Sequence, residues 1–410
     1  MFKIQGFFAE RAKHHNASDI KEAFHLAEKP SVISFAGGFP GPHTFPREIV
    51  KKLLEKVVSE RGESSLQYAP TEGVSELRKL LAREMTREGV AADASDILIT
   101  SGSQQGLDLL CKAFIDPGDV VLVEIPSYMG ALGAMDNYEA DKVGIPLDGE
   151  GICVDLLETT LQRLQREGRK PKLLYLVTNF SNPAGVTLSW ERRKKVIELA
   201  QKYDFLILED NPYGAINFLE KIPPHIKTLD QEGRVIYLGS FSKSFMPGIK
   251  IGWLCAHSAI IDKLTMVKQG TDLCTNSLGQ YLALYFMKEG YLQEHIGCLT
   301  DIYRKKRDTM LQAMHRYFPA EVSWTEPRGG FFTFVTLPAG INAKTMLTKA
   351  IQFDVAYVPG NCFFVNGQGH NTLRLAYSQV ELEKIEEGIQ RLARVISEEM
   401  KGLQKESFCA

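Results

Sequence analysis

Lys243 lies between two serines in the stretch GSFSKSFMPGIKIGW (239–253), directly after an apolar run and before a Pro-Gly turn. A partly desolvated lysine near a second cation, here Lys250, has a lowered pKa and keeps part of its amine neutral. A neutral amine can attack a carbonyl carbon, while Lys250 and the hydroxyls of Ser240 and Ser242 can donate to a dianionic phosphate. The stretch therefore predicts a phosphate site that holds a reactive amine, although an isolated lysine is usually a solvated surface cation.

A second candidate anion site follows the apolar run at residues 96–100. The segment SGSQQGLDLL (101–110) is a small polar turn that opens a helical pattern. Gly102, Ser103 and Gln104 therefore stand where a helix offers unpaired backbone N–H groups, which bind anions. The same residues are also typical of an ordinary helix cap with a glycine in the turn. The turn indicates phosphate binding only in combination with other groups of one site.

Two further turns follow apolar runs and carry side chains suited to catalysis. NFSNPAG places Asn182 before a proline, a pattern that is also typical of a surface β-turn. EDNPYG places Asp210 and Tyr213 at the end of the run 204–210. A carboxylate there can cap a helix, bind Mg²⁺ or pair with a cationic ring. Magnesium catalysis needs more acidic residues than the neighbouring turns supply, so no metal site is expected.

These turns are expected to meet because of the elements that precede them. Short apolar runs alternate with amphipathic segments such as WERRKKVIELAQKY, which is typical of βαβ units in a parallel sheet. Parallel strands bring their carboxyl ends to one edge of the sheet, where ligands bind. The predicted strands are residues 96–100, 119–124, 172–178, 204–210, 234–240 and 251–255.

The chain is predicted to be an α/β protein with two domains, because 410 residues exceed what one ordinary core holds. The large domain is predicted at 45–300. The end of the chain carries a long charged helix, the hairpin-like segment PRGGFFTFVTL and a final helix. Residues 1–44 plus 301–410 are therefore predicted to form a small α+β domain.

Composition restricts the partners of this chain. The 48 basic and 50 acidic residues nearly balance, so no net field draws the protein to nucleic acid or to an anionic membrane. No run of about 18 apolar residues occurs, and no membrane span is expected. The seven cysteines include no C-x-x-C pair, which argues against a disulfide framework and a zinc site and indicates a cytoplasmic protein. Small molecules or a second copy of the chain are the expected partners.

The strand ends together provide an amine, an anion cup, a carboxylate, an asparagine and a tyrosine, which is what pyridoxal phosphate requires. SNPAG, EDNPYG and SFSKSFMPGIKIGW, in this order, resemble motifs of the fold type I pyridoxal-phosphate aminotransferases of class I/II. Segments of the 2-aminoadipate/kynurenine aminotransferase-like subgroup are similar to residues 34–46, 66–78, 101–110 and 372–378. The resemblance implies a mixed, mostly parallel seven-stranded sheet flanked by helices, with a smaller α+β domain.

The resemblance also implies the catalytic roles. Lys243 would bind the cofactor covalently and later move the proton between the substrate α-carbon and the cofactor. Asp210 would pair with the pyridinium nitrogen. Asn182 and Tyr213 would donate to the ring oxygen, and Tyr128 in EIPSYMG would stack on the ring.

Binding roles follow from the same resemblance. The phosphate would be held by Gly102, Ser103, Gln104, Ser240, Ser242 and Lys250. Tyr68 would reach it from the neighbouring subunit, which makes the expected active unit a homodimer with the site at the interface. Arg374 would clamp the substrate α-carboxylate, assisted by Asn182 and by a backbone N–H of Gly38.

Two positions depart from the family pattern. Lys250 and Lys21 stand where arginine is usual, and a lysine cannot form the planar fork of a guanidinium. The expected activity is transfer of the amino group of an L-amino acid to a 2-oxo acid, with 2-oxoglutarate as the expected acceptor. The alternatives are a pyridoxal-phosphate lyase or decarboxylase on the same fold, and a non-catalytic ligand-sensing module.

Overall fold

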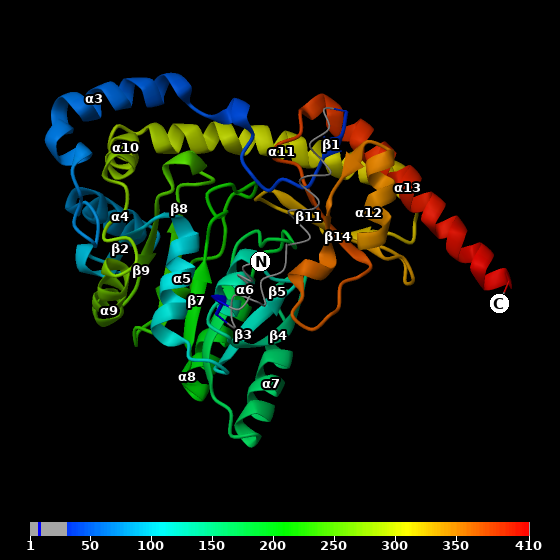
Figure 1. Cartoon of the computed structure of the whole chain (residues 1–410), viewed down its shortest axis with the longest axis horizontal. Helices are drawn as coiled ribbons and strands as arrows, with labels where there is room; N and C mark the ends of the chain where they lie inside the picture. The colour runs from blue at the N-terminus through cyan, green and yellow to red at the C-terminus, as the bar shows by residue number, and fades with distance from the viewer. Residues whose placement is uncertain (1–6, 10–30, 410) are drawn as a thin grey trace.

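The computed structural model describes residues 7–9 and 31–409, and its centre is an eight-stranded sheet (Figure 1). The order in the sheet is β2–β9–β8–β7–β6–β3–β4–β5. The strands are β2 (Ile97–Thr100), β3 (Val120–Ile125), β4 (Asp141–Asp148), β5 (Gly151–Ile152), β6 (Pro171–Val177), β7 (Leu206–Asp210), β8 (Val235–Ser240) and β9 (Gly252–Cys255). The neighbours from β8 to β4 are parallel, whereas β9 is antiparallel to β2 and β8, and β5 is antiparallel to β4.

Six of these strands coincide with the predicted apolar runs, and the mostly parallel sheet is confirmed. β4 has no such run, because its sequence DKVGIPLD contains glycine and proline and Ile145 is its one buried residue. The resemblance implies seven strands, and the eighth is β5, which adds two residues to the edge in a hairpin with β4.

Alternation along the strands decides which helices cover each face of the sheet. In β6, Leu173 and Tyr175 pack in a core cluster with α5 (Gly102–Phe114), α6 (Met129–Asp136) and α9 (Ser258–Gln269). Leu174 and Leu176 pack on the opposite face with α7 (Val154–Arg166) and α8 (Trp190–Tyr203). Because both faces are covered, the central strands are mostly apolar.

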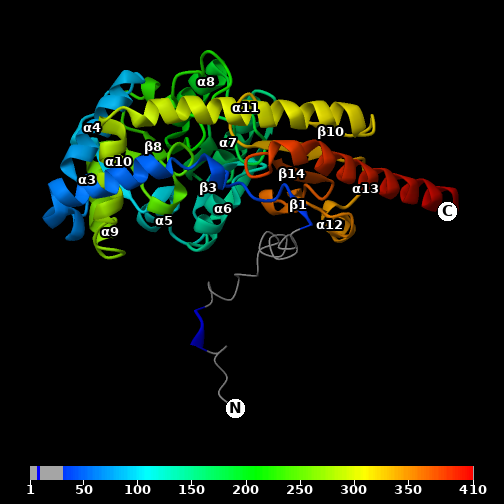
Figure 2. The same cartoon turned by 90° about the horizontal axis from the view of Figure 1, so that it is seen from above.

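A third group of helices closes the β2 end of the sheet. α3 (Arg47–Leu66), α4 (Ser75–Arg87) and α10 (Ser277–Lys288) bury side chains against Ile97, Ile99 and Tyr237. The long helix α11 (Tyr291–Tyr317) then runs along the molecule toward the second sheet (Figure 2). The final helix α13 (Leu382–Cys409) packs on α11 and projects beyond it.

A four-stranded antiparallel sheet forms beside the large one, in the order β10–β11–β14–β13. Its strands are β10 (Ser323–Trp324), β11 (Phe332–Thr336), β13 (Val358–Pro359) and β14 (Thr372–Ala376), with α12 (Ala343–Gln352) and the parallel pair β1 (Ile33–Ser34) and β12 (Val355–Ala356) nearby. The predicted boundary between the two domains, at residue 300, falls inside α11. The division into a large domain at 45–300 and a small domain at 1–44 plus 301–410 stays a prediction. Among the described helices, none combines the length and the apolar character needed to cross a bilayer.

Candidate active site

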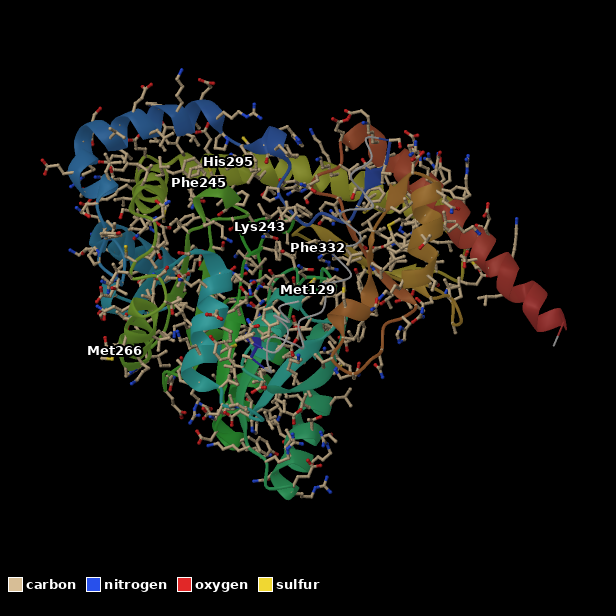
Figure 3. All side chains as sticks on the ribbon, viewed as in Figure 1. Met129, Lys243, Phe245, Met266, His295 and Phe332 are labelled. Atoms are coloured by element: carbon tan, nitrogen blue, oxygen red, sulfur yellow. The ribbon has the colours of Figure 1, made fainter. Side chains whose placement is uncertain are left out.

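A cavity of about 370 Å³ lies at the carboxyl edge of the large sheet. Lys243 and Met129, which both line it, lie near the centre of the molecule (Figure 3). The cavity brings together these predicted residues: Gly38, Gly102, Ser103, Gln104, Tyr128, Asn182, Asp210, Tyr213, Ser240, Ser242, Lys243, Lys250 and Arg374. Most of them meet because β2, β3, β6, β7 and β8 all run in one direction, so the turns after them open at one edge. Gly38 and Arg374 come from the chain after β1 and from β14 of the small sheet.

Two predicted residues do not line this cavity. Lys21 lies outside the described residues. Tyr68 follows α3, is 76 % exposed and borders a separate surface hollow. The role predicted for Tyr68 concerns a neighbouring subunit, so it stays a prediction. Among the described residues, no group of three His, Cys, Asp or Glu side chains is placed to hold a metal ion.

Sequence reasoning missed other residues of the site. Phe39, Met129 and Gly130 line the cavity, and each stands next to or close to a predicted residue in the chain. Proximity to Gly38 and Tyr128 was the available signal for them. Tyr175 contacts Asp210 from the middle of β6, where a buried aromatic residue is typical of ordinary core and carries no signal of a role.

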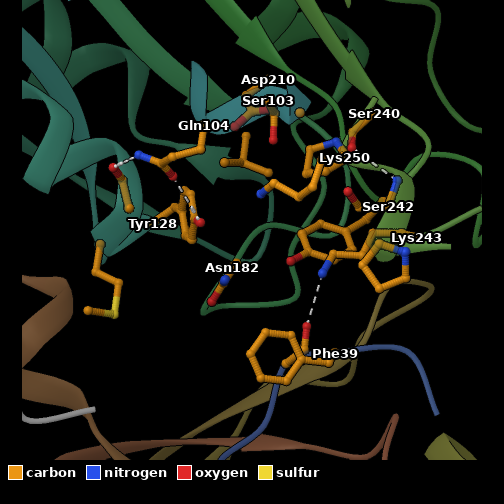
Figure 4. Close-up of a pocket in the computed structure, with 18 of the residues that line it drawn as sticks. Phe39, Ser103, Gln104, Tyr128, Asn182, Asp210, Ser240, Ser242, Lys243 and Lys250 are labelled. Atoms are coloured by element: carbon orange, nitrogen blue, oxygen red, sulfur yellow. Dashed lines mark hydrogen bonds between the residues drawn. The ribbon is translucent and has the colours of Figure 1, made fainter. Parts of the chain in front are cut away.

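The amine of Lys243 projects into the cavity from the turn after β8 (Figure 4). Its Nζ donates to the carbonyl oxygen of Gly38 at 3.1 Å. Burial lowers the pKa of Lys243 from 10.5 to about 8, and the positive charges of Arg374 and Lys250 act in the same direction. About half of these amines are neutral at pH 8, compared with about 0.3 % of amines with the ordinary pKa. The site therefore holds a nucleophile that is ready to react near neutral pH.

Asp210 ends β7 and is 2 % exposed. Its Oδ2 accepts a hydrogen bond of 2.8 Å from the hydroxyl of Tyr175, whereas Oδ1 is buried without a hydrogen-bond partner. Burial raises the pKa of Asp210 from 3.8 to about 7, and the hydrogen bond from Tyr175 only partly opposes this rise. A buried carboxylate without a counter-charge gains strongly from a cationic partner. Oδ1 is thus an acceptor suited to a protonated ring nitrogen.

The first turn of α5 forms the anion cup. Gly102 opens the helix at φ +74°, a conformation that favours glycine. β9 approaches this turn closely, since a Cβ on Gly252 would lie 2.8 Å from the backbone of Gly102 and Ser103. Lys250 Nζ lies 3.6 Å from the point that a Cβ of Gly102 would occupy. Unpaired helix N–H groups and an ammonium therefore converge on one place, which suits a phosphate.

Polar contacts fix the wall beside this cup. The Tyr128 hydroxyl donates to Gln104 Oε1 at 3.4 Å, and Gln104 Nε2 donates to the carbonyl oxygen of Gly130 at 2.7 Å (Figure 4). On the other side, Ser240 Oγ accepts from the backbone N–H of Ser242 at 3.1 Å. The ring of Tyr128 is therefore held at the cavity wall, where it can pack against a flat ligand.

Arg374 enters the cavity from β14 of the small sheet and is 4 % exposed. Its Nη1 donates to Asn182 Oδ1 at 2.9 Å and its Nη2 donates to the carbonyl oxygen of Ala36 at 2.7 Å. The Nε is buried without a hydrogen-bond partner, and the guanidinium carbon lies 4.5 Å from the ring centre of Phe332. Burial lowers the pKa of Arg374 to about 10, so it stays charged at neutral pH. The fixed guanidinium can bind a carboxylate.

These groups fit pyridoxal phosphate. Asp210 Oδ1 can accept from the ring nitrogen, the Gly102 turn and Lys250 can hold the phosphate, and Lys243 can react with the aldehyde. When bound, this cofactor supplies an aldehyde that takes up an amino group and a ring that withdraws electrons from the substrate α-carbon. Arg374 also lines the cavity, where its guanidinium can bind a ligand that carries a carboxylate.

Comparison with known proteins gives the same result. The family model described as "Aminotransferase class I and II" matches residues 33–392. The chain is 48 % identical to the aromatic-amino-acid aminotransferase 1 of Thermococcus litoralis over 96 % of this chain and 95 % of that protein.

Solved structures extend the likeness to the fold. The Pyrococcus horikoshii kynurenine aminotransferase, in complex with PMP, KYN as substrates and KYA as products, superposes with a TM-score of 0.94 at 45 % identity, covering 97 % of this chain and 98 % of that one. LysN, the α-aminoadipate aminotransferase of Thermus thermophilus, complexed with N-(5'-phosphopyridoxyl)-L-leucine, gives 0.89 at 38 % identity, with coverage of 97 % and 98 %. The chain therefore belongs to the class I and II aminotransferase family and is a pyridoxal-phosphate-dependent transaminase.

Proposed function

We propose that the protein transfers the amino group of L-amino acids with aromatic or other apolar side chains to 2-oxoglutarate. The observation that carries the proposal is one cavity that holds the Lys243 amine, the unpartnered Oδ1 of Asp210 and the guanidinium of Arg374. An amine, an acceptor for a ring cation and a carboxylate clamp are the three functions that transamination of an amino acid requires.

The proposed class of amino donor is inferred from the residues that line the cavity. Phe39 and Met129 line it, and the exposed fraction of the Phe39 side chain is 49 %. Among the described lining residues, the cations are Lys243, Lys250 and Arg374, and each already has a partner group in the proposed complex. Among these described residues no further cation is left for an acidic donor side chain, and glutamate, the aminated form of 2-oxoglutarate, would depend on Lys21 as the acceptor does. The name of the Thermococcus litoralis relative, an aromatic-amino-acid aminotransferase, supports the same class.

The acceptor rests on the resemblance at Lys21. 2-Oxoglutarate carries a second carboxylate, and Lys21 stands where the family often has an arginine that contacts the side-chain carboxylate of acidic substrates, so Lys21 would pair with it. We also assign the enzyme to the cytoplasm, since Cys111, Cys153, Cys255, Cys274 and Cys298 are free thiols, as a reducing compartment would keep them.

The residues of the chain divide the work of the reaction. Arg374 orients the α-carboxylate, which fixes the direction of the α-C–H bond. The neutral Nζ of Lys243 would take the α-proton as a general base and hold it for return as a general acid. Asp210 would accept from the ring nitrogen and keep it protonated. Tyr213 and Asn182 line the same cavity as Lys243 and Arg374 and can donate to the ring oxygen.

The test is a spectroscopic titration of the holoenzyme with single L-amino acids, followed by 2-oxo acids. We expect phenylalanine, tyrosine and other apolar donors to discharge the visible absorption band, and 2-oxoglutarate to restore it. Aspartate should discharge the band only weakly. Release of ammonia would instead indicate a lyase, and a band that no amino acid discharges would indicate a ligand sensor. Preferential discharge by aspartate would contradict the donor class.

We further propose a homodimer in which Tyr68 completes the site of the partner. Tyr68 and Leu66 are 76 % and 71 % exposed although both are large and apolar, and such surface is typical of an interface. The segment is not loose, because Ser277 Oγ of α10 donates to the carbonyl oxygen of Gln67 at 2.6 Å.

Hybrid dimers test this shared site. We expect Lys243→Ala and Tyr68→Ala homodimers to be inactive at low cofactor concentration, because each lacks one required group in both sites. A hybrid of the two chains, purified through two different tags, regains one complete site and about half the activity of the unaltered dimer. A hybrid as inactive as its parents would show that Tyr68 does not act across subunits.

Tyr175→Phe should change the reactivity and the absorption spectrum of the bound cofactor while the fold is retained. The change removes the donor to Asp210 Oδ2 and leaves a buried ring of similar size. We expect a decrease in kcat of about tenfold, the equivalent of one hydrogen bond to a charged group. The absorption spectrum of the bound cofactor should shift at the same time, because the carboxylate that faces its ring nitrogen is no longer held. An unchanged spectrum and kcat would show that Asp210 needs no such support.

A further inference from the structure

A charged pair outside the cavity holds the turn that forms the phosphate cup. The segment between α9 and α10 rests on the first turn of α5, and Asp272 is its point of contact. Asp272 Oδ2 accepts from Gln105 Nε2 at 2.6 Å and from Ser101 Oγ at 3.2 Å. Gln105 Oε1 in turn accepts from the backbone N–H of Ser101 at 2.7 Å. Ser101, the residue that precedes Gly102, is thus fixed through both its hydroxyl and its backbone.

Lys268 lies behind this carboxylate. Its side chain is 0 % exposed, and its Nζ donates to Asp272 Oδ1 at 2.6 Å. The backbone N–H of Asp272 also donates to the carbonyl oxygen of Lys268 at 3.0 Å. A lysine is almost never fully buried unless it is paired. The pair therefore presents hydrogen-bond acceptors to the turn while its charges cancel.

The negative charge of Asp272 has to be neutralised because the neighbouring turn binds an anion in the proposed complex. Gly102 and Ser103 hold a dianionic phosphate in the proposed complex, and an unpaired carboxylate close behind them would repel it. A neutral residue could not accept two hydrogen bonds on one oxygen so strongly, since bonds to charged acceptors are the stronger ones. A carboxylate with a buried counter-ion meets both requirements.

We propose that Asp272 and Lys268 are positioning residues for the phosphate of the cofactor. Asp272 sets the geometry of the turn 101–105, and Lys268 removes the net charge that Asp272 would otherwise place near the phosphate. Neither residue lines the cavity, so neither touches the substrate. The proposal rests on the assignment of this turn as the phosphate site in the proposed function.

The experiment compares pyridoxal phosphate with pyridoxal, which lacks the phosphate. The dissociation of pyridoxal phosphate is measured by diluting the holoenzyme. The binding of pyridoxal is measured by adding it to the full chain after the cofactor has been removed. Lys268→Met should raise the dissociation constant of pyridoxal phosphate about tenfold or more and leave that of pyridoxal within about twofold. Lys268→Met/Asp272→Asn should recover part of the loss, because the uncompensated carboxylate is gone.

A second variant tests the proposal independently in case Lys268→Met does not fold. Gln105→Leu removes one donor to Asp272 without disturbing the charged pair. It should weaken the binding of pyridoxal phosphate several-fold and leave the binding of pyridoxal unchanged. Lys112→Ala is the matched control: it removes the exposed bond from Lys112 Nζ to Thr271 Oγ1 in the same segment and should change neither ligand.

Two outcomes would overturn the proposal. Equal weakening of both ligands would mean that the pair only stabilises the fold, and unchanged binding of pyridoxal phosphate in the Lys268 and Gln105 variants would mean that the turn needs no support. Failure of the unaltered enzyme to bind pyridoxal phosphate in preference to pyridoxal would instead contradict the phosphate site itself.

Discussion

Replacement of Lys243 with alanine is expected to abolish amino-group transfer. In the proposed function the side chain supplies both the nucleophile that attaches the cofactor and the base that moves the α-proton. Loss of a positioned proton-transfer group alone costs about 10²- to 10⁴-fold in rate. Nothing else among the described lining residues replaces it, because Lys250 lies at the phosphate cup and Arg374 stays protonated.

Two measurements check this expectation. Borohydride reduction followed by denaturation should leave the cofactor on the unaltered chain and release it from the Lys243→Ala chain. Turnover of the variant should stay at background with excess pyridoxal phosphate, and an added small amine should restore part of the half-reaction. Lys250→Arg is the matched control, with retained activity and unchanged or tighter cofactor binding. Normal turnover of Lys243→Ala would refute the assignment of Lys243.

Asp210→Asn is expected to lower kcat by about 10²- to 10³-fold, the effect of removing one preorganised electrostatic contact. The amide keeps the shape of the side chain and removes the charge that holds the ring nitrogen protonated. The Tyr175 hydroxyl can still donate to the amide oxygen, so the fold should be preserved. Steady-state kinetics should show the loss in kcat, and the absorption spectrum of the bound cofactor should shift with it.

Glu124→Gln is the control for this variant. Glu124 lies on β3, is 3 % exposed and accepts from the backbone N–H of Val177 at 3.1 Å. Burial, and to a smaller extent the charge of Asp210, raise the pKa of Glu124 to about 8. Glu124 is therefore mostly protonated at pH 7, and glutamine, which is neutral and similar in shape, should change kcat by no more than about threefold. Equal losses in both variants would mean that packing rather than the charge of Asp210 is at stake.

Much of this site was accessible from the sequence because of how a parallel sheet works. Lys243 and Asn182 follow apolar runs and Asp210 ends one, and these runs became β8, β6 and β7 in the structure. Buried parallel strands are apolar on both faces, so they are easily recognised in the sequence. Because ligands bind at the carboxyl ends of such strands, the residues at and after these ends could be predicted to form the site. β4 was not predicted because only Ile145 among its residues is fully buried and its sequence contains Gly144 and Pro146.

The sequence alone therefore determined most of the sheet, the cofactor and most of the residues that meet in the cavity, since these follow from local patterns and from motifs at strand ends. Only the tertiary structure decided which groups support them. Tyr175 and Asp272 act on Asp210 and on the Gly102 turn through contacts between residues 35 and 171 positions apart in the chain. The pKa of Lys243 near 8 is a tertiary property as well, because burial and the charge of Arg374 from another sheet produce it. Local pattern cannot encode such contacts, since they depend on how separate elements pack.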